Sequence, residues 1–324
     1  MTTVDELRSC TVLVVGDVML DEQLWGDVRR LSPEAPVPIV EIGSRTVTPG
    51  GAANTAAGVI ALGARARLTG VVGADANGGV LQEALRTSGI DPTGIFTDAG
   101  RVTTTKSRLL ARGQHMVRID SEDRAPLPPT IEEAVLRYAT TQLADVDVVV
   151  LSDYGKGVLS NNLAKAIITL ARVPVIADPC GTDYTKYRGA AMVTPSVDEV
   201  ESAVGRHLRT DADLIRAGVE LVELLPGTDI LITRGAQGMW LMSANGVALD
   251  VPADARSVYD VTGAGDTVVA AIAVALGSGI PRAGTIGLAN IAAGIVVGKA
   301  GTATVSLDEL TAAVRDGRTS VEAR

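Results

Sequence analysis

Short apolar runs alternate with longer amphipathic stretches along most of this chain. β-branched and aliphatic runs predict buried strands at residues 11–15, 68–72, 146–151, 173–177, 191–193 and 229–233. Helical periodicity lies between them, near residues 80–87, 131–143, 163–171 and 212–224. This alternation is typical of a parallel sheet with helices on both faces. We therefore predict an α/β fold of three layers, α/β/α, with a mainly parallel central sheet.

Two segments do not follow this alternation of strands and helices. Residues 31–41 contain three prolines, and residues 103–120 alternate apolar with polar side chains. Both are predicted to be half-exposed strands outside the main sheet. Such a sheet could act as a lid that excludes water from a reaction, although an ordinary surface hairpin is the alternative. We expect one domain over residues 1–324, with lid inserts near 18–48 and 95–121. After residue 228, strands at 229–233, 238–243 and 247–251 follow in quick succession.

Composition narrows the possible partners. Hydrophobic residues make up 46% of the chain but aromatic residues only 2%, so the core must consist mainly of aliphatic side chains. The net charge of −9 disfavours binding to nucleic acid or anionic membrane. Cys10 and Cys180 form no C-x-x-C pair, which indicates reduced thiols rather than a disulfide framework or a zinc ribbon. The first residues do not resemble a signal peptide, and no apolar run reaches spanning length. We expect a cytoplasmic protein.

The segment from Asp260 to Thr267, DVTGAGDT, carries the strongest chemical signal because an apolar helical run follows it. Small residues at Gly263, Ala264 and Gly265 would let a phosphate approach the backbone. The free N–H groups of a helix's first turn carry about half a positive charge. Asp266 would then act as a general base for phosphoryl transfer. The alternative is a glycine-rich turn in which Asp266 caps the helix.

A second glycine-rich element, Gly50-Gly51-Ala52-Ala53-Asn54, also opens a helix, and Asp17 follows the first strand directly. Neither the P-loop pattern nor the complete dinucleotide-binding pattern occurs, which disfavours a P-loop enzyme or a dehydrogenase. The two histidines, His115 and His207, cannot form a metal cluster and make a Ser-His-Asp hydrolase improbable.

Together the two glycine-rich elements resemble the paired motifs of the ribokinase-like (PfkB) sugar kinases. The match extends over nearly the whole chain, because residues 31–38, 152–157, 178–183, 187–190 and 290–301 resemble segments of the D-glycero-D-manno-heptose 7-phosphate kinases in that family. Two positions depart from the family pattern. Ser196 stands where N-x-x-E is common, and Cys180 replaces the lysine of Asp-Pro-Lys-Gly.

The resemblance implies a ribokinase-like fold and ATP-dependent phosphorylation of the C1 hydroxyl of D-glycero-D-manno-heptose 7-phosphate. The product would be the β-1,7-bisphosphate, on the route to ADP-heptose. Some relatives carry a further nucleotidyltransferase domain with an H-x-G-H motif. That motif does not occur here, so we expect the bisphosphate but not the nucleotide sugar. A kinase for another sugar or sugar phosphate and a non-catalytic sugar-phosphate sensor on a kinase scaffold are the two alternatives.

The resemblance also assigns residues on the sugar side. Asp266 would accept the C1 proton while the amides of Gly263, Ala264 and Gly265 hold the migrating phosphoryl group. Sugar hydroxyls would be held by Asp17, Gly50, Gly51 and Asn54. An already phosphorylated substrate needs cations, for which the candidates are Lys106, Arg108 and Lys156, with Arg118 as a further one. Lys106 and Arg108 would share one face of a strand.

On the nucleotide side, the resemblance assigns ATP contacts to Ser196, Thr233, Gly235, Gly238 and Asn290. Glu199 is the protein candidate for Mg²⁺, which usually keeps several waters. A monovalent cation such as K⁺ is a further expected cofactor. The expected partners are thus a small sugar phosphate and ATP, with no nucleic acid and no membrane. A homodimer through the lid strands is also expected, because their edges would otherwise stay exposed.

Overall fold

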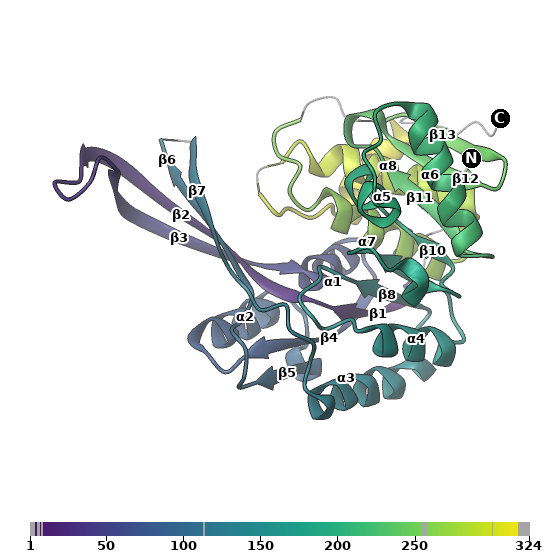
Figure 1. Cartoon of the computed structure of the whole chain (residues 1–324), viewed down its shortest axis with the longest axis horizontal. Helices are drawn as coiled ribbons and strands as arrows, with labels where there is room; N and C mark the ends of the chain where they lie inside the picture. The colour runs from purple at the N-terminus through teal and green to yellow at the C-terminus, as the bar shows by residue number, and fades with distance from the viewer. Residues whose placement is uncertain are drawn as a thin grey trace.

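The computed structural model describes Val4, Leu7 and residues 9–112, 114–254, 258–299 and 301–316. Within these residues the main sheet has nine strands in the order β13-β12-β11-β10-β9-β8-β1-β4-β5 (Figure 1). They are β1 (Thr11–Gly16), β4 (Arg65–Gly73), β5 (Ile95–Asp98), β8 (Val148–Ser152), β9 (Val175–Asp178), β10 (Met192–Val193), β11 (Asp229–Thr233), β12 (Met239–Ser243) and β13 (Gly246–Val251). Neighbours from β5 to β11 are parallel, whereas β12 and β13 pair antiparallel. The predicted mainly parallel sheet is confirmed.

Helices cover both faces of this sheet. One layer contains α1 (Ala52–Ala61), α2 (Ala76–Thr87), α7 (Ala264–Gly277), α8 (Arg282–Val296) and α9 (Leu307–Arg315), and the other contains α3 (Pro129–Gln142), α4 (Asn161–Leu170), α5 (Val197–Val204) and α6 (Asp211–Leu224). Alternate residues of a strand point to opposite faces. Val12 and Val14 of β1 accordingly pack into the first layer, and Leu13 and Val15 pack into the second. The three-layer prediction is confirmed.

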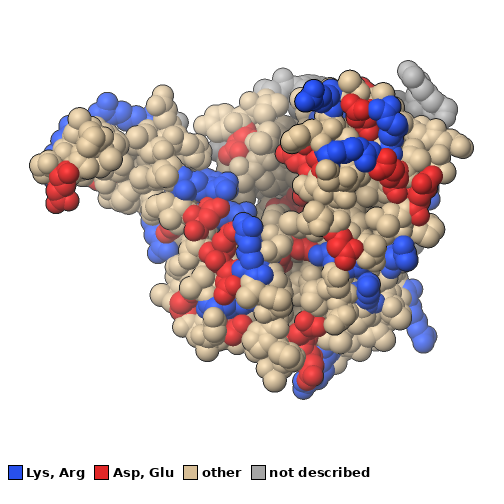
Figure 2. Space-filling model, in the orientation of Figure 1, with Lys and Arg blue, Asp and Glu red and all other residues tan. Residues whose placement is uncertain are grey.

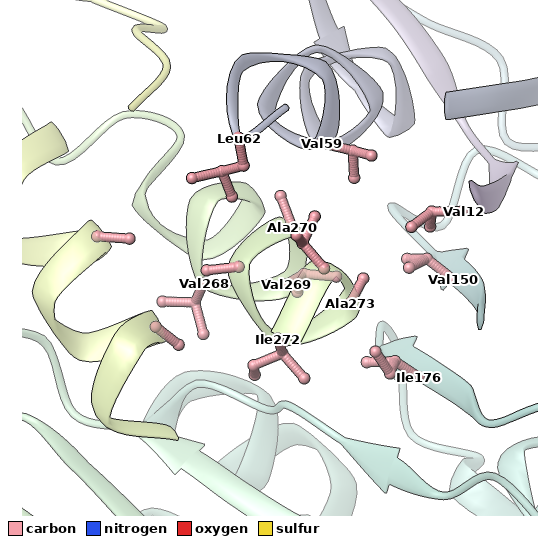
Figure 3. Close-up of a cluster of buried hydrophobic side chains, with 14 of the residues drawn as sticks. Val12, Val59, Leu62, Val150, Ile176, Val268, Val269, Ala270, Ile272 and Ala273 are labelled. Carbon is pink, nitrogen blue, oxygen red and sulfur yellow. The ribbon is translucent and has the colours of Figure 1, made fainter. Parts of the chain in front are cut away.

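Helix α7 lies in the middle of the first layer and is buried on nearly every side (Figure 3). Its apolar residues are small, so neighbouring helices approach closely. A Cβ built on Gly58 of α1 would lie 3.0 Å from the Cβ of Ala270 in α7. Because α1 and α7 pack this closely, their first turns lie side by side, and both glycine-rich motifs are found there.

A second, four-stranded sheet projects from the body (Figure 1). It is the sheet predicted as a lid, and we refer to it by that name. Its order is β3-β2-β6-β7, formed by β2 (Val18–Leu31), β3 (Pro38–Gly51), β6 (Thr105–Ala111) and β7 (Gln114–Ser121). The strand predicted over residues 31–41 is wrong in its first part, because residues 32–37 are a turn between β2 and β3. Pro33 and Pro36 lie in that turn, where their missing N–H groups interrupt no strand pairing.

The second lid segment begins later than residue 95. Residues Ile95–Asp98 form β5, which pairs with β4 at the edge of the main sheet. The lid strands of this second segment therefore start at Thr105. Elsewhere the predicted strands and helices agree with the observed ones to within a few residues. Among the described helices, none combines the length and the apolar character that a membrane span requires.

Candidate active site

Asp266 lies in the first turn of α7 and is buried, with 6% of its surface exposed. Its carboxylate accepts three hydrogen bonds from residues of other elements. Asn54 Nδ2 donates to Oδ2 at 2.7 Å, while Thr55 Oγ1 and Tyr154 OH donate to Oδ1 at 3.1 and 2.6 Å. Burial raises the pKa of Asp266, and the three hydrogen bonds oppose that rise because they stabilise the charged form. The carboxylate is therefore held in one orientation with a raised proton affinity.

The backbone before Asp266 is open to an anion at Gly265, whereas the Ala264 N–H already donates to the carbonyl oxygen of Val261 at 3.2 Å. Gly263 caps α7 in the left-handed conformation, with φ of 78°, and as a glycine it brings no side chain to cap the helix. A Cβ at Gly263 would come within 2.9 Å of Asn54 Nδ2, so the position needs glycine for space as well. A Cβ on Gly265 would meet no described atom within 4 Å. A phosphate could therefore approach the first-turn amides of α7 at Gly265.

The glycine pair at the end of β3 brings the chain close to β1 and β2. A Cβ on Gly51, which has φ of 59°, would lie 2.4 Å from the carbonyl oxygen of Asp17, and one on Gly50 would lie 2.3 Å from Asp21 Oδ2. Gly51 is thus required by its backbone contact and positive φ, whereas a side chain at position 50 would have to displace the carboxylate of Asp21. The expected contacts of Gly50 and Gly51 with sugar hydroxyls remain a prediction.

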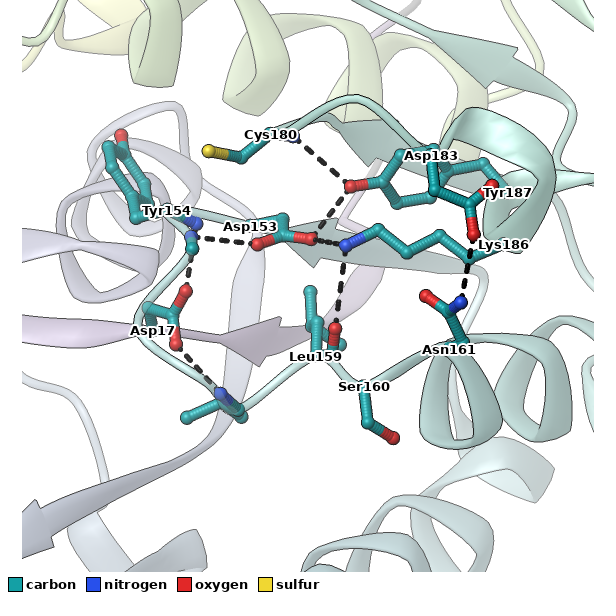
Figure 4. Close-up of polar contacts among 12 residues, drawn as sticks. Asp17, Asp153, Tyr154, Leu159, Ser160, Asn161, Cys180, Asp183, Lys186 and Tyr187 are labelled. Atoms are coloured by element: carbon teal, nitrogen blue, oxygen red, sulfur yellow. Dashed lines mark hydrogen bonds and ion pairs between the residues drawn. The ribbon is translucent and has the colours of Figure 1, made fainter. Parts of the chain in front are cut away.

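Asp17, directly after β1, is 1% exposed and holds the loop of residues 153–158 (Figure 4). Its Oδ2 accepts from the backbone N–H groups of Tyr154 and Lys156 at 2.8 and 3.0 Å, and its Oδ1 accepts from that of Val158 at 3.1 Å. Burial raises the pKa of Asp17, and these amides oppose the rise. Asp17 is thus engaged with the protein, and its expected contact with the sugar remains a prediction.

Asp153 anchors the same loop from the other side. Its Oδ2 accepts from Tyr187 OH at 2.7 Å and from the ammonium group of Lys186, and its Oδ1 accepts from the Gly155 N–H at 2.9 Å (Figure 4). Tyr187 OH in turn accepts a hydrogen bond from the Cys180 N–H at 3.2 Å. The loop that carries Tyr154 and Lys156 is thus fixed at both ends by buried carboxylates.

Cations gather where the lid meets the body. Lys106 Nζ lies 5.4 Å from the centre of the Tyr154 ring, Arg108 Nη1 donates to Asp21 Oδ1 at 2.7 Å, and Lys156 Nζ lies 2.5 Å from Glu122 Oε2. Burial lowers the pKa of Lys106, as do the nearby charges of Lys156 and Arg118. Arg118 itself is exposed and pairs with Asp120. Figure 2 shows basic and acidic side chains mixed on the face where the projecting sheet joins the body.

A cavity of about 200 Å³ opens beside Gly265. Its walls come from the carboxyl ends of neighbouring parallel strands and the loops after them, where ligands bind in open α/β sheets. They include Asp153, Tyr154, Asp178, Cys180, Thr194, Ser196, Glu199, Thr233, Gly265 and Val268. The cavity therefore brings together the predicted residues Ser196, Glu199, Thr233 and Gly265, although they are scattered in the sequence.

Carboxyl groups give this cavity an acidic wall. Glu199 Oε2 accepts from the backbone N–H and hydroxyl of Ser196 at 2.7 and 2.8 Å, which closes a capping box at the start of α5. Burial raises the pKa of Glu199 and raises that of Asp178 strongly, and the negative charges of Glu199 and Asp266 add to the rise at Asp178. Ser196 acts here as a helix cap, a role that asparagine can also fill.

The remaining nucleotide candidates lie outside the residues that line this cavity. Asn290, 2% exposed in α8, donates from Nδ2 to the carbonyl oxygen of Pro252 at 2.8 Å. A Cβ on Gly238 would lie 2.0 Å from the carbonyl oxygen of Val251, so close backbone packing accounts for this glycine. Gly235 has φ of 55°, and a Cβ added there would meet no described atom within 4 Å. Their contacts with ATP remain predictions.

Sequence reasoning missed three residues around Asp266. Tyr154 lies within the 152–157 motif, but only Lys156 was singled out there. Thr55 directly follows Asn54, and its hydroxyl was not considered. Asp21 lies on β2 opposite Lys106 of β6. The motif around Tyr154 could have signalled its role, whereas Thr55 and Asp21 carry no local pattern that distinguishes them from ordinary helix and strand residues.

Comparison with known proteins identifies the family of this chain and its fold. The sequence profile of the pfkB family of carbohydrate kinases matches residues 10–310. The bifunctional protein HldE of Geobacter metallireducens is 46% identical over 306 residues, which cover 94% of this chain and 62% of that protein. The solved structure of Arabidopsis thaliana ribokinase, complexed with ribose and ATP, superposes with a TM-score of 0.71 at 20% identity, covering 94% of this chain and 98% of the ribokinase. The solved structure of Escherichia coli phosphofructokinase-2, in complex with potassium, superposes with a TM-score of 0.73 at 17% sequence identity. It covers 94% of this chain and 98% of the phosphofructokinase.

The chain therefore belongs to the pfkB family of carbohydrate kinases. The family expected from the two glycine-rich motifs is confirmed, and the ribokinase-like fold is confirmed by the structural neighbours. The chain spans about three fifths of the length of the bifunctional relative.

Proposed function

We propose that this chain is the ATP-dependent kinase of D-glycero-D-manno-heptose 7-phosphate, acting on the C1 hydroxyl to give the β-1,7-bisphosphate. The observation that carries the proposal is the position of Lys106, whose ammonium group faces the ring of the tyrosine bonded to Asp266. Positive charge beside the base suits a sugar that already bears a phosphate. The similarity to HldE along 94% of this chain supports the same substrate class.

Asp266 supplies the base for this reaction. As the C1 oxygen bonds to phosphorus and the bond from phosphorus to the leaving ADP oxygen breaks, the hydroxyl proton passes to Asp266. A carboxylate with a raised pKa is better matched to this transfer than an ordinary one, and an anomeric hydroxyl is more acidic than other sugar hydroxyls. The first-turn amides of α7 would hold the phosphoryl oxygens.

The residues present fit ATP with Mg²⁺. The uncapped first turn of α7 and the open space at Gly265 suit the triphosphate, and Ser196, Thr233 and Glu199 line the adjoining cavity. No group of three or more His, Cys, Asp and Glu side chains in the described residues could hold a metal by itself. This fits a Mg²⁺ ion held mainly by phosphates and water, with Glu199 as the protein contact. When bound, the ion would neutralise charge on the phosphate oxygens.

We further propose that the enzyme uses a monovalent cation such as K⁺, as the potassium complex of phosphofructokinase-2 suggests. The reaction is assigned to the cytoplasm, where ATP is available and the free thiols Cys10 and Cys180 would stay reduced.

A homodimer through the lid is part of the proposal. The lid strands expose large apolar side chains, among them Trp25, Ile42, Val117 and Ile119, the last of which is 56% exposed. A second lid would cover them. Light scattering should give twice the chain mass, and Ile119→Lys is expected to lower it toward one chain. A dimer unaffected by this change would place the interface elsewhere.

The test of the activity is a coupled ADP-release assay over a panel of sugars and sugar phosphates. Heptose 7-phosphate is expected to give the highest kcat/KM. Faster turnover of an unphosphorylated sugar would favour the alternative of a kinase for another sugar. Tight binding of a sugar phosphate in calorimetry, with no ADP release under Mg-ATP, would favour the sensor.

A further inference from the structure

Tyr154 contacts three functional candidates: Asp17, Lys106 and Asp266. Its backbone N–H donates to Asp17 Oδ2 at 2.8 Å, which fixes its place in the loop. Lys106 Nζ faces its ring at 5.4 Å, and its hydroxyl donates to Asp266 Oδ1 at 2.6 Å. The tyrosine therefore joins the cations at the foot of the lid to the carboxylate at the start of α7.

The two oxygens of Asp266 differ in their partners. Oδ1 accepts from both Tyr154 OH and Thr55 Oγ1, which uses the two lone pairs that a carboxylate oxygen offers. Among the described residues, Oδ2 accepts only the bond from Asn54 Nδ2. One lone pair of Oδ2 therefore remains for a substrate hydroxyl.

We propose that Tyr154 is a positioning residue for the base: its hydroxyl holds Oδ1 of Asp266 so that Oδ2 is the oxygen that takes the sugar proton. The inference rests on the proposed kinase reaction and deepens it. Tyr154 itself stays protonated throughout, because burial and the charge of Asp266 raise the pKa of its phenol well above 10. It therefore donates to the carboxylate over the whole working pH range.

This arrangement predicts an effect on the acidity of the base. Titratable groups on several elements surround Asp266: the carboxyl groups of Asp21 of β2 and Asp178 of β9 interact with it electrostatically, and Lys106 of β6 lies across the Tyr154 ring. Burial raises the pKa of Asp266, whereas the Tyr154 hydroxyl lowers it. Because hydrogen bonds to the charged form stabilise it, losing the hydroxyl moves the pKa of Asp266 further upward.

The experiment compares the wild type with Tyr154→Phe, which keeps the ring and removes the hydroxyl. We expect kcat to fall roughly tenfold or more with the KM for the sugar changed less than about threefold. The acidic limb of the kcat profile should move up by about one pH unit. The matched control is Tyr138→Phe in α3, whose ring packs on Phe96 away from the site. In this variant kcat and the acidic limb of its pH profile should not change.

A second readout needs no turnover. Aspartates labelled with ¹³C at the carboxyl are titrated by NMR, and Asp266 is assigned as the signal lost in Asp266→Asn. Its pKa should rise in Tyr154→Phe and, by less, in Thr55→Val, which removes the other donor to Oδ1 and serves if the first variant folds poorly. An unshifted Asp266 signal in the folded variant, or an unchanged kcat profile, would overturn the role of Tyr154. Absence of sugar-phosphate turnover in the wild type would instead count against the proposed function, and the titration would still decide Tyr154.

Discussion

Asn54 Nδ2 donates a 2.7 Å hydrogen bond to Asp266 Oδ2 across 212 positions of sequence. The bond joins the first turn of α1 to the first turn of α7, and each of these helices begins directly after a glycine with positive φ, Gly51 and Gly263. Close packing of Gly58 on Ala270 holds the two helices in this relation. The two glycine-rich motifs thus form one site.

Replacing the base tests the chemistry assigned to α7. Asp266→Asn is expected to lower kcat by roughly a hundredfold or more, because the amide cannot accept the sugar proton. ATP binding, measured by calorimetry, should be retained, since the backbone amides of α7 are unchanged. Asp308→Asn, at an exposed position of α9, is the control and should keep full activity. Activity surviving in Asp266→Asn would mean that another group is the base.

Position 51 is predicted to need glycine for two reasons: its φ is positive, and a Cβ would not fit there. Gly51→Ala should cost about 3 kcal/mol or more of unfolding free energy, because positive φ and a clash with the Asp17 carbonyl act together. The matched control is Gly205→Ala, at a helix C-cap with φ of 68° and no described atom within 4 Å of the new Cβ. It carries the conformational cost alone, about 1 kcal/mol. If denaturant titrations show the same loss of unfolding free energy in both variants, small movements of the chain relieve the clash with the Asp17 carbonyl.

Lys156 is predicted to select for phosphorylated sugars. It is buried beside Glu122 and belongs to the cation group around Lys106. Lys156→Gln should raise the KM for the sugar phosphate about tenfold or more, the effect of losing one charge-assisted hydrogen bond. Binding of an unphosphorylated sugar should be unaffected. Lys165→Gln, exposed on α4, is the control. Equal effects on both sugars would show that Lys156 supports the loop rather than the phosphate.

Asp178 should make stability depend on pH. Burial and the charges of Glu199 and Asp266 raise its pKa in the folded protein above the unfolded value. The ionised form is therefore penalised by folding. This cost is fully present above the folded pKa and is lost progressively as the pH falls from the folded pKa toward the lower unfolded pKa. Asp178→Asn, which keeps an acceptor for Thr194, should unfold at a higher temperature than the wild type at pH 8. The difference should vanish on acidification, and a pH-independent difference would point to altered packing instead.

Much of the framework could be predicted because it follows from local patterns. Short continuous apolar runs and amphipathic runs of period 3.6 report burial directly, so the parallel strands and the helices between them could be predicted within a few residues. Failures occurred where the pattern was ambiguous. Residues 31–41 contain apolar side chains, yet their prolines mark a turn. Residues 95–98 adjoin the lid segment in sequence but pair with β4, and only the sheet could show that.

The sequence by itself determined where two helices begin and that small residues line their first turns, because a glycine-rich turn followed by an apolar run marks a helix start. It also identified the family, which is confirmed, and made Asp266 the candidate base, which remains a prediction. Only the tertiary structure decided that Tyr154 and Thr55 bind the same oxygen of Asp266, and that Asp17 and Asp153 fix one loop from two sides. These contacts join residues far apart in the chain. Their geometry depends on how closely α1, α7 and the strand ends pack, which no local pattern encodes.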